Sequence, residues 1–210
     1  MKKITFLFLA QLLLLGILQA QNEKDEEEKK GFKKENLFTG GSVSLAFYNN
    51  TFLIGGSPVF GYSLTRWLDA GVVVNYNYTS YRDYQNVFDA KLKQTNYGGG
   101  AFLKLYPIKF LFAQAQVEHN WLNLKYLPPN NGNSIKSKAT GNSLLIGGGY
   151  CTGRESGSGQ PFYYLSVMFD IADDPNSPYT DQYGRAIPII RGGLQIPLFQ
   201  GKNNNTRNNY

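Results

Sequence analysis

The feature that most constrains this chain is an alternation with a period of two, in which single small or polar residues separate bulky apolar ones. Val72 and Tyr76, for example, share one register, while Gly71 and Asn75 share the other. Successive side chains of a β-strand point to opposite faces, so this period predicts strands. The alternation is clear in residues 51–64, 68–79, 111–121, 163–171 and 190–198, and weaker in 38–48, 95–106 and 141–152. We expect eight strands of roughly 10 to 14 residues, long enough to cross a bilayer at a tilt.

Composition indicates what surrounds these strands. Aromatic residues make up 15% of the 210 residues and charged residues only 17%, yet the mean hydropathy is −0.34. The apolar surface exceeds what a soluble core needs, while the negative hydropathy excludes a bundle of transmembrane helices. A membrane barrel reconciles both facts because only alternate residues of each strand face lipid. Lys and Arg are scattered along the sequence, so we expect no nucleic-acid partner.

The two ends of the chain differ from its middle. Residues 1–20 combine Lys2 and Lys3 with an apolar run that ends at a small residue, which predicts a signal peptide. Residues 21–36 are nearly all charged and predict a disordered periplasmic segment. Residues 200–210 are a polar tail, so the barrel is expected in 37–199.

The expected connections alternate between short and long. Asn49–Asn50, Thr65–Arg66 and Pro107–Ile108 predict tight turns, whereas polar stretches at about 79–94, 127–140 and 172–185 predict long loops. One inner turn, residues 152–160, is also longer. Short turns at one end and long loops at the other are typical of outer-membrane barrels. Pro58, Pro188 and Pro197 fall inside apparent strands, where each removes a ladder hydrogen bond.

Aromatic residues gather near the ends of the expected strands, as with Tyr76 and Tyr78, with Tyr97 and Tyr106, and with Phe110 and Trp121. Amphipathic rings favour the membrane interface, so two such clusters per strand predict aromatic girdles. Cross-strand aromatic pairs on a soluble sheet are the alternative interpretation.

With these residues in view, the chain resembles the eight-stranded outer-membrane β-barrel family, which includes the OmpA-like and OmpX-like small barrels. The resemblance rests on three segments: GGSPVFGYSLTRWLDAGVVVNYNY, TNYGGGAFLKLYPIKFLFAQAQVEHNW and LLIGGGYC. It implies an all-β, eight-stranded antiparallel up-and-down transmembrane β-barrel in the cell outer membrane, with outer-membrane lipid and the outer-membrane assembly machinery as partners. Members commonly end on an aromatic residue that this machinery reads. Phe199 would fill that role, although eleven residues follow it.

No constellation in the sequence is typical of an enzyme. His119 is the only histidine and shares a register with Trp121, so we expect it to point outward near an interface. Cys151 is the only cysteine, which excludes an intramolecular disulfide and a cysteine-based metal site. The glycine runs 98–100 and 147–149 are not phosphate loops because no helix follows them. We expect no catalytic residue, no metal and no cofactor.

A set of polar residues shares the register that should face the barrel interior. Eight strands enclose a lumen just wide enough to be filled by side chains, so charges there must be paired. We expect Glu118 and Asp170 to meet Lys104 and Arg191 in a network with a structural role; a narrow pore is the alternative. The predicted lumenal residues are Asp69, Lys104, Gln114, Gln116, Glu118, Asp170, Arg191 and Gln195.

The expected external loops are rich in aromatic residues, which suit adhesion or capture of an unknown surface ligand. The predicted surface-contact residues are Tyr81, Arg82, Tyr84, Phe88, Tyr126, Tyr179 and Tyr183. The sequence thus favours a non-enzymatic outer-membrane barrel that makes surface contacts. A small-solute pore and a soluble periplasmic lipocalin-like ligand carrier are the alternatives, and the carrier would place its apolar residues inside.

Overall fold

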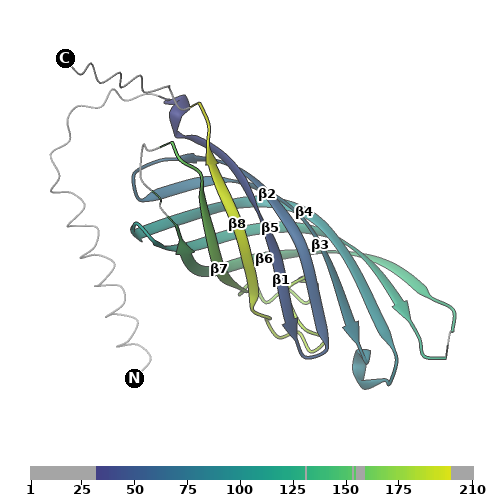
Figure 1. The fold of residues 1–210 in the computed structure, drawn as a ribbon. Helices are drawn as coiled ribbons and strands as arrows, with labels where there is room; N and C mark the ends of the chain where they lie inside the picture. The colour runs from purple at the N-terminus through teal and green to yellow at the C-terminus, as the bar shows by residue number, and fades with distance from the viewer. Residues whose placement is uncertain (1–31, 131, 153, 155–158, 200–210) are drawn as a thin grey trace, which may run out of the picture. The chain divides into compact units, whose positions relative to one another are not determined.

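Eight antiparallel strands close into a barrel in the computed structural model, which describes residues 32–130, 132–152, 154 and 159–199. Each strand pairs with the next along the chain, and β8 pairs with β1, which closes the barrel (Figure 1). Strand β6 pairs with β7 only from Leu145 onward. The predicted fold class is therefore confirmed. The strands are β1 (Leu37–Tyr48), β2 (Thr51–Ser63), β3 (Leu68–Arg82), β4 (Lys91–Ile108), β5 (Leu111–Leu127), β6 (Ile135–Cys151), β7 (Phe162–Asp170) and β8 (Ile189–Pro197). Short 3-10 helices occupy Lys34–Asn36 and Tyr84–Asn86.

The predicted signal peptide (1–20), most of the predicted charged segment and the polar tail (200–210) lie outside the described residues. Within the described ranges no helix is long and apolar enough to cross a membrane. The chain divides into the units 1–33 and 34–210, and the fold described here is that of the second.

The period-two alternation separates the barrel's two surfaces. On β3, Val74 is 61% exposed and points outward, while its neighbour Asn75 is 1% exposed and points inward. On β7, Leu165 is 57% exposed, while Ser166 is 2% exposed. The same division holds on β5, where Val117 faces out and Glu118 faces in. The bulky apolar residues therefore form the exterior, and the polar residues fill the interior.

The barrel has two unlike ends. At the terminal end, β1 begins, β8 ends, and the connections 64–67 and 109–110 are tight. The opposite end, the loop end, carries the connections 49–50, 83–90, 128–134 and 171–188. Asn49 and Asn50 have φ angles of 43° and 59°, the left-handed pair that a two-residue type I′ hairpin requires.

Strands β3 to β6 continue past the barrel at the loop end, as Figure 1 shows. Strands β4, β5 and β6 have 18, 17 and 17 residues, whereas β7 and β8 have 9 each. The predicted long loops 79–94 and 127–140 are therefore wrong in extent, since only 83–90 and 128–134 are loops. The reason is physical: in this extension the outward register becomes polar, as at Asn123 and Lys125, while Leu122 takes the inward register. The outward apolar stripe that marks the barrel strands therefore ends before the strands do. We call this part of β3–β6 the sheet extension.

The three prolines predicted to interrupt strands lie where the loss of an N–H donor removes little of the hydrogen-bond ladder. Pro188 precedes β8 and Pro197 is its last residue. Pro58 lies within β2, where the pairing to β3 is interrupted between Gly56 and Val59. The missing N–H of Pro58 thus coincides with a gap in the ladder.

Close strand packing explains a glycine in β4. A Cβ atom at Gly100 would overlap the backbone carbonyl oxygen of Val117 on β5, and backbone atoms of a paired strand cannot move aside. At Gly192 on β8, by contrast, the nearest atom to an added Cβ is Leu165 Cδ1 at 3.9 Å.

We predict that Gly100→Ala destabilises the barrel by about 1–3 kcal/mol, because overpacking forces the β4–β5 ladder apart. Gly192→Ala adds the same methyl group in open space and is the matched control. The measurement is the temperature at which the folded form, seen by its shifted gel mobility, converts to the unfolded form. Equal transition temperatures for the two variants would contradict the packing explanation.

Candidate functional site

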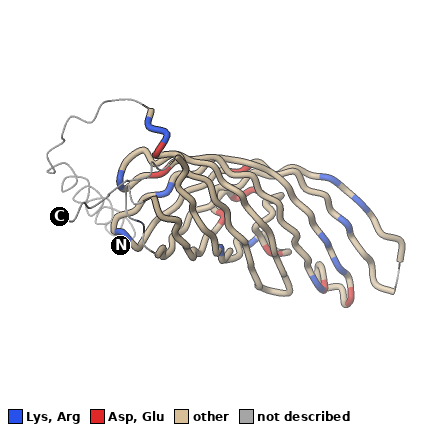
Figure 2. Tube along the Cα trace, turned by 45° about the horizontal axis from the view of Figure 1, so that its top comes forward, with Lys and Arg blue, Asp and Glu red and all other residues tan. Residues whose placement is uncertain are grey.

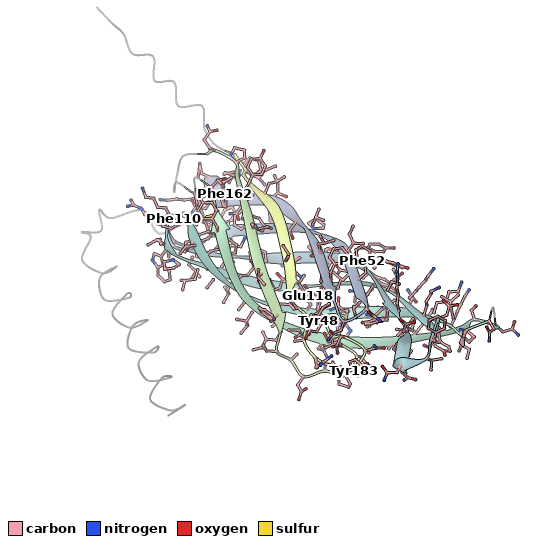
Figure 3. The ribbon with its side chains drawn as sticks, turned by 60° about the horizontal axis from the view of Figure 1, so that its bottom comes forward. Tyr48, Phe52, Phe110, Glu118, Phe162 and Tyr183 are labelled. Atoms are coloured by element: carbon pink, nitrogen blue, oxygen red, sulfur yellow. The ribbon has the colours of Figure 1, made fainter. Side chains whose placement is uncertain are left out.

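The barrel interior holds charged and polar side chains at two levels, one near the middle and one near the terminal end. Figure 3 shows Glu118 between Phe110 and Phe162 at the terminal end and Tyr183 at the loop end. The acidic residues are Glu118 at the middle level and Asp69 at the terminal level, 4% and 0% exposed. A buried carboxylate is costly unless it is paired and hydrogen-bonded, so its partners determine what the lumen can do.

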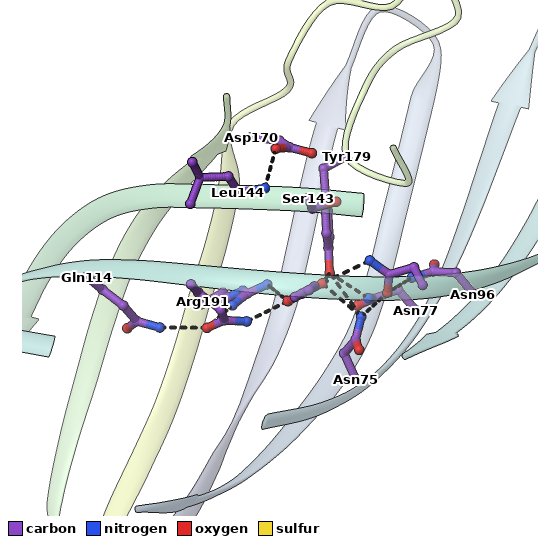
Figure 4. Close-up of polar contacts among 12 residues, drawn as sticks. Asn75, Asn77, Asn96, Gln114, Ser143, Leu144, Asp170, Tyr179 and Arg191 are labelled. Carbon is purple, nitrogen blue, oxygen red and sulfur yellow. Dashed lines mark hydrogen bonds and ion pairs between the residues drawn. The ribbon is translucent and has the colours of Figure 1, made fainter. Parts of the chain in front are cut away.

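Glu118 of β5 is the centre of the middle level, and its partners Asn75, Tyr179 and Arg191 are labelled in Figure 4. Its Oε1 atom lies 3.4 Å from an Arg191 guanidinium nitrogen and accepts a hydrogen bond from Gln116. Its Oε2 atom accepts hydrogen bonds from the Tyr179 hydroxyl at 2.7 Å and from the Asn75 amide at 3.0 Å. Arg191 also donates to the Gln116 carbonyl oxygen at 3.2 Å. One carboxylate thus joins β3, β5, β8 and the connection that carries Tyr179.

Tyr179 closes the middle level from the loop end. It belongs to residues 171–188, which we call the plug segment, and it is fully buried. Its hydroxyl accepts hydrogen bonds from the amides of Asn75 at 3.3 Å and Asn77 at 3.1 Å. Ser177, in the same segment, donates to Asp170 and accepts from the Tyr179 N–H at 3.1 Å. The plug segment therefore fills the barrel mouth with a specifically bonded side chain.

Asp69 of β3 organises the terminal level. It forms an ion pair of 2.6 Å with Arg154 and accepts a hydrogen bond of 3.0 Å from Gln195. The Arg154 guanidinium lies 3.8 Å from the centroid of the Tyr106 ring and also donates to the Arg66 carbonyl. Arg154 comes from the connection between β6 and β7, so a side chain from outside the strands also enters the lumen.

Lys104 of β4 lies among aromatic rings. Its Nζ atom is 4.1 Å from the ring centroid of Tyr164, 4.9 Å from Phe112 and 5.8 Å from Phe102. Such cation–π contacts hold an ammonium group where water is scarce. The expected meeting of Lys104 with Glu118 or Asp170 is therefore wrong: rings surround its ammonium group, and its cross-strand partner on β3 is Asp69.

Asp170 and Gln114, two further residues predicted to face the lumen, lie at different heights in the barrel. Asp170 faces inward at the loop end but meets neither Lys104 nor Arg191; it accepts hydrogen bonds from the Leu144 and Ala172 N–H groups and from Ser177. The reason is height, since Asp170 ends β7 near the barrel mouth. Gln114 donates to Gln116 at 2.7 Å. Of the predicted set, the structure brings together Glu118, Gln114, Gln116 and Arg191 at one level and Asp69 and Gln195 at the other.

The predicted surface-contact residues differ in how exposed they are. Tyr81 is 5% exposed and donates to the Thr180 carbonyl at 3.1 Å, and Tyr179 is buried in the lumen, so both are wrong as surface residues. Tyr84 and Tyr126 are half-buried, with ring centroids 6.1 Å apart. Of the predicted surface-contact residues, three are exposed at the loop end: Arg82, Phe88 and Tyr183.

Sequence reasoning missed several lumenal residues. Arg154 and Tyr179 lie in connections, where no alternation shows that a side chain turns inward. Asn75, Asn77 and Asn120 do lie in the inward register of their strands and are at most 1% exposed. Their register predicts that they face the lumen, but an uncharged amide, unlike an ionised group, does not require a charged partner and so does not indicate a network.

Asp181 holds the hairpin of the plug segment. It accepts a hydrogen bond from the Arg185 N–H at 3.0 Å and forms an ion pair of 2.8 Å with the Arg185 guanidinium. The Asn49 amide donates to it at 3.1 Å and the Tyr183 N–H at 2.9 Å. Burial alone would raise the pKa of Asp181, but these hydrogen bonds together lower it below its ordinary value of 3.8.

A closed sheet with bulky apolar residues outside and paired charges inside defines the class: an eight-stranded β-barrel of the transmembrane type. The resemblance to small eight-stranded barrels inferred from the sequence is confirmed at the level of the fold.

Comparisons with known proteins identify no family for this chain. No protein-family model and no curated protein matches the chain. Among solved structures, the attachment invasion locus protein Ail of Yersinia pestis is 12% identical, with a TM-score of 0.42, over 77% of this chain and 94% of that one. Neisserial surface protein A is 12% identical, with a TM-score of 0.37, over 77% and 95%. The N-terminal β-barrel domain of Pseudomonas aeruginosa OprF is 15% identical, with a TM-score of 0.36, over 77% and 97%.

We predict that Arg191→Met lowers the free energy of unfolding by about 3–5 kcal/mol, because it leaves the Glu118 carboxylate buried without its cation. Adding Glu118→Gln to this variant should restore part of the loss, since the double variant buries no charge at that level. Denaturant titrations of the wild type, both single variants and the double variant measure the coupling. Additive effects in the double variant would contradict the pairing.

We predict a pH dependence for the plug segment. Because the folded pKa of Asp181 is lowered, its contribution is complete at neutral pH and is lost as pH falls from 3.8 through the folded value. Asp181→Asn should reproduce the acidic state at pH 7, with hydrogen exchange in residues 171–188 faster by roughly 5- to 100-fold, the equivalent of about 1–3 kcal/mol. Asp173→Asn, an exposed change in the same segment, is the control. Equal exchange in both variants would contradict the role of Asp181.

Proposed function

We propose that this chain is a non-enzymatic, integral outer-membrane β-barrel whose loop end faces outward and makes surface contacts. The observation that carries the proposal is the inverted surface: large apolar side chains cover the exterior, and ionised side chains are buried in the lumen. In water this arrangement would expose far more apolar surface than a soluble protein tolerates. In a bilayer the same exterior is matched by hydrocarbon.

The height of the apolar belt supports this setting. On β5 the outward residues from Leu111 to Trp121 span ten residue steps, about 34 Å along the strand and about 26 Å of height at a tilt of roughly 40°. Outer-membrane barrels carry an apolar band of about 25 Å. Rings mark both borders: Tyr97 stacks on Trp121 at 5.8 Å toward the loop end, and Phe110 lies 6.1 Å from Tyr150 at the terminal end.

The lumenal contacts support a closed barrel over a small-solute pore. Tyr179, Glu118 and Arg191 meet across the middle of the lumen, and Asp69 with Arg154 crosses the terminal level. The lipocalin-like alternative requires an apolar interior, and Asn75, Gln116 and Glu118 occupy that interior instead. We therefore propose neither transport nor carriage of an apolar ligand.

The contacts of His119 support a non-enzymatic role. His119 points outward, where its Nδ1 atom lies 2.8 Å from the Asn142 side-chain oxygen and its ring packs edge-on against Trp121. These partners orient the imidazole at the membrane border and supply neither a nucleophile nor a carboxylate.

The loop end offers the surface for contacts with a partner. Gln182 of the plug segment accepts a hydrogen bond of 2.9 Å from the Gln85 N–H, and the Tyr183 hydroxyl donates to Asn86 at 2.6 Å. These bonds join the plug segment to the connection 83–90, which presents Phe88 at 87% exposure. We propose this joined surface, with Arg82 and the exposed parts of Tyr84, Tyr126 and Tyr183, as the face available to a surface ligand. Assembly by the outer-membrane machinery belongs to the same proposal, although Phe199, expected in the last strand, lies two residues past the end of β8.

We predict that the expressed protein sediments with outer membranes, shifts its gel mobility on heating and gives no steady ion current in planar bilayers. The apolar belt requires the first two results and the bonded lumen the third. Sedimentation, gel mobility before and after boiling, and conductance measure the three properties separately. Recovery in a detergent-free soluble fraction would overturn the membrane assignment, and a steady current would overturn only the closed lumen.

A further inference from the structure

Basic residues gather along the sheet extension, as Figure 2 shows. Lys93 of β4, Lys125 of β5 and Lys136 of β6 are exposed and share one row across the sheet; we call them the lysine row. Lys93 is directly opposite Lys125, and Lys125 is directly opposite Lys136. In the part of the chain that the structure describes, none of the three forms an ion pair.

Like charges directly opposite each other destabilise a sheet. Adjacent strands lie only about 4.8 Å apart, so the backbones that carry the three lysines lie within about 10 Å of one another. Lys138, in the row nearer the barrel, adds a fourth positive charge opposite Asn123. This arrangement calls for an anion that bridges several strands at once.

The height of the lysine row restricts that anion. The row lies four residues beyond the row of Tyr76, Tyr97 and Trp121, whose rings mark the border of the apolar belt. Four residues correspond to about 13 Å along a tilted strand and about 10 Å of height. A lysine stem can reach back several ångströms toward the membrane. The ammonium groups are therefore level with lipid headgroups.

A groove continues the lysine row toward β2 and β3. It has a volume of about 670 Å³ and is lined by Arg82, Lys91 and Lys93 together with the rings of Phe52 and Tyr78, and by Ser80, Asp83 and Asp89. Asp89 is paired with Lys91 at 2.9 Å, and Asp83 accepts hydrogen bonds from Asn50 and the Asp89 N–H. Arg82 and Lys93 remain available to an anion, beside rings that suit an acyl chain.

We propose that the lysine row and this groove bind the phosphate groups of a lipid in the outward leaflet, with part of an acyl chain along Phe52 and Tyr78. The charge of the surface matches a phosphate, and its position just above the aromatic border matches a lipid headgroup. The proposal rests on the membrane setting proposed above. The site would anchor one specific lipid against β2–β6 and complete the charge balance of the sheet extension.

The test uses the full chain in phosphatidylcholine nanodiscs, with dansyl-labelled lipid A carrying two phosphates as the probe. Trp67→Phe leaves Trp121, at the border below the lysine row, as the sole tryptophan donor. Energy transfer from Trp121 should report enrichment of the labelled lipid at the site. Lys93→Gln with Lys125→Gln should weaken the apparent affinity roughly fivefold per lysine, on the order of 25-fold together. Lys34→Gln with Lys109→Gln removes the same charge at the terminal end and should leave transfer to Trp121 unchanged.

Three comparisons distinguish the outcomes. Lipid A without phosphates should lose the enrichment, and inorganic phosphate in solution should not reproduce it. Equal transfer in the two lysine variants, or competition by a soluble sulfated polysaccharide with no lipid enrichment, would overturn the lipid site. The Trp121 emission spectrum in plain phosphatidylcholine reports insertion independently, so an inserted barrel without lipid enrichment contradicts only this inference. Failure to insert contradicts the proposed function itself.

Discussion

The buried carboxylate of Glu118 is the constraint on which most of the barrel interior depends. An ionised group in a narrow, side-chain-filled lumen is tolerated only with a cation and several hydrogen bonds around it. Arg191 supplies the cation from the opposite part of the sheet, and Asn75 and Tyr179 supply the bonds from β3 and the plug segment. Satisfying one carboxylate therefore fixes the distance between opposing walls and also places the plug segment. These contacts fill the middle of the lumen with paired side chains.

The sequence predicts which face each residue occupies, because the period of two is local. Glu118 and Val117 differ by one position and therefore face opposite solvents. It does not predict which inward residues meet across the lumen, because that depends on the stagger of all eight strands around the barrel. Asp170 illustrates the difference: its face was predicted, but its height places it beside Ser177 and away from Arg191. Lys104 likewise faces inward and meets rings at its own level.

Segments outside the apolar belt were harder to predict for a related reason. The alternation records contact with lipid, so it fades where a strand continues into water, and the sheet extension therefore resembles loops in the sequence. Arg154 and Tyr179 belong to connections that return into the lumen, and no local pattern records that return. What the sequence does show there is composition, a polar stretch with single ionisable or aromatic residues. Their partners become apparent only when the barrel is closed.

The lysine row follows from the same closure. Inside the belt, the register of β4, β5 and β6 is fixed by the outward apolar residues, since a slip of one position would turn every one of them into the lumen. The ladder continues without a shift from Gly98 opposite Asn120 to Lys93 opposite Lys125. The sheet extension therefore cannot slide to separate its lysines. The register fixed within the apolar belt keeps them opposite one another, where they repel. In the membrane setting proposed above, the phosphate layer supplies the counter-charge that offsets this repulsion.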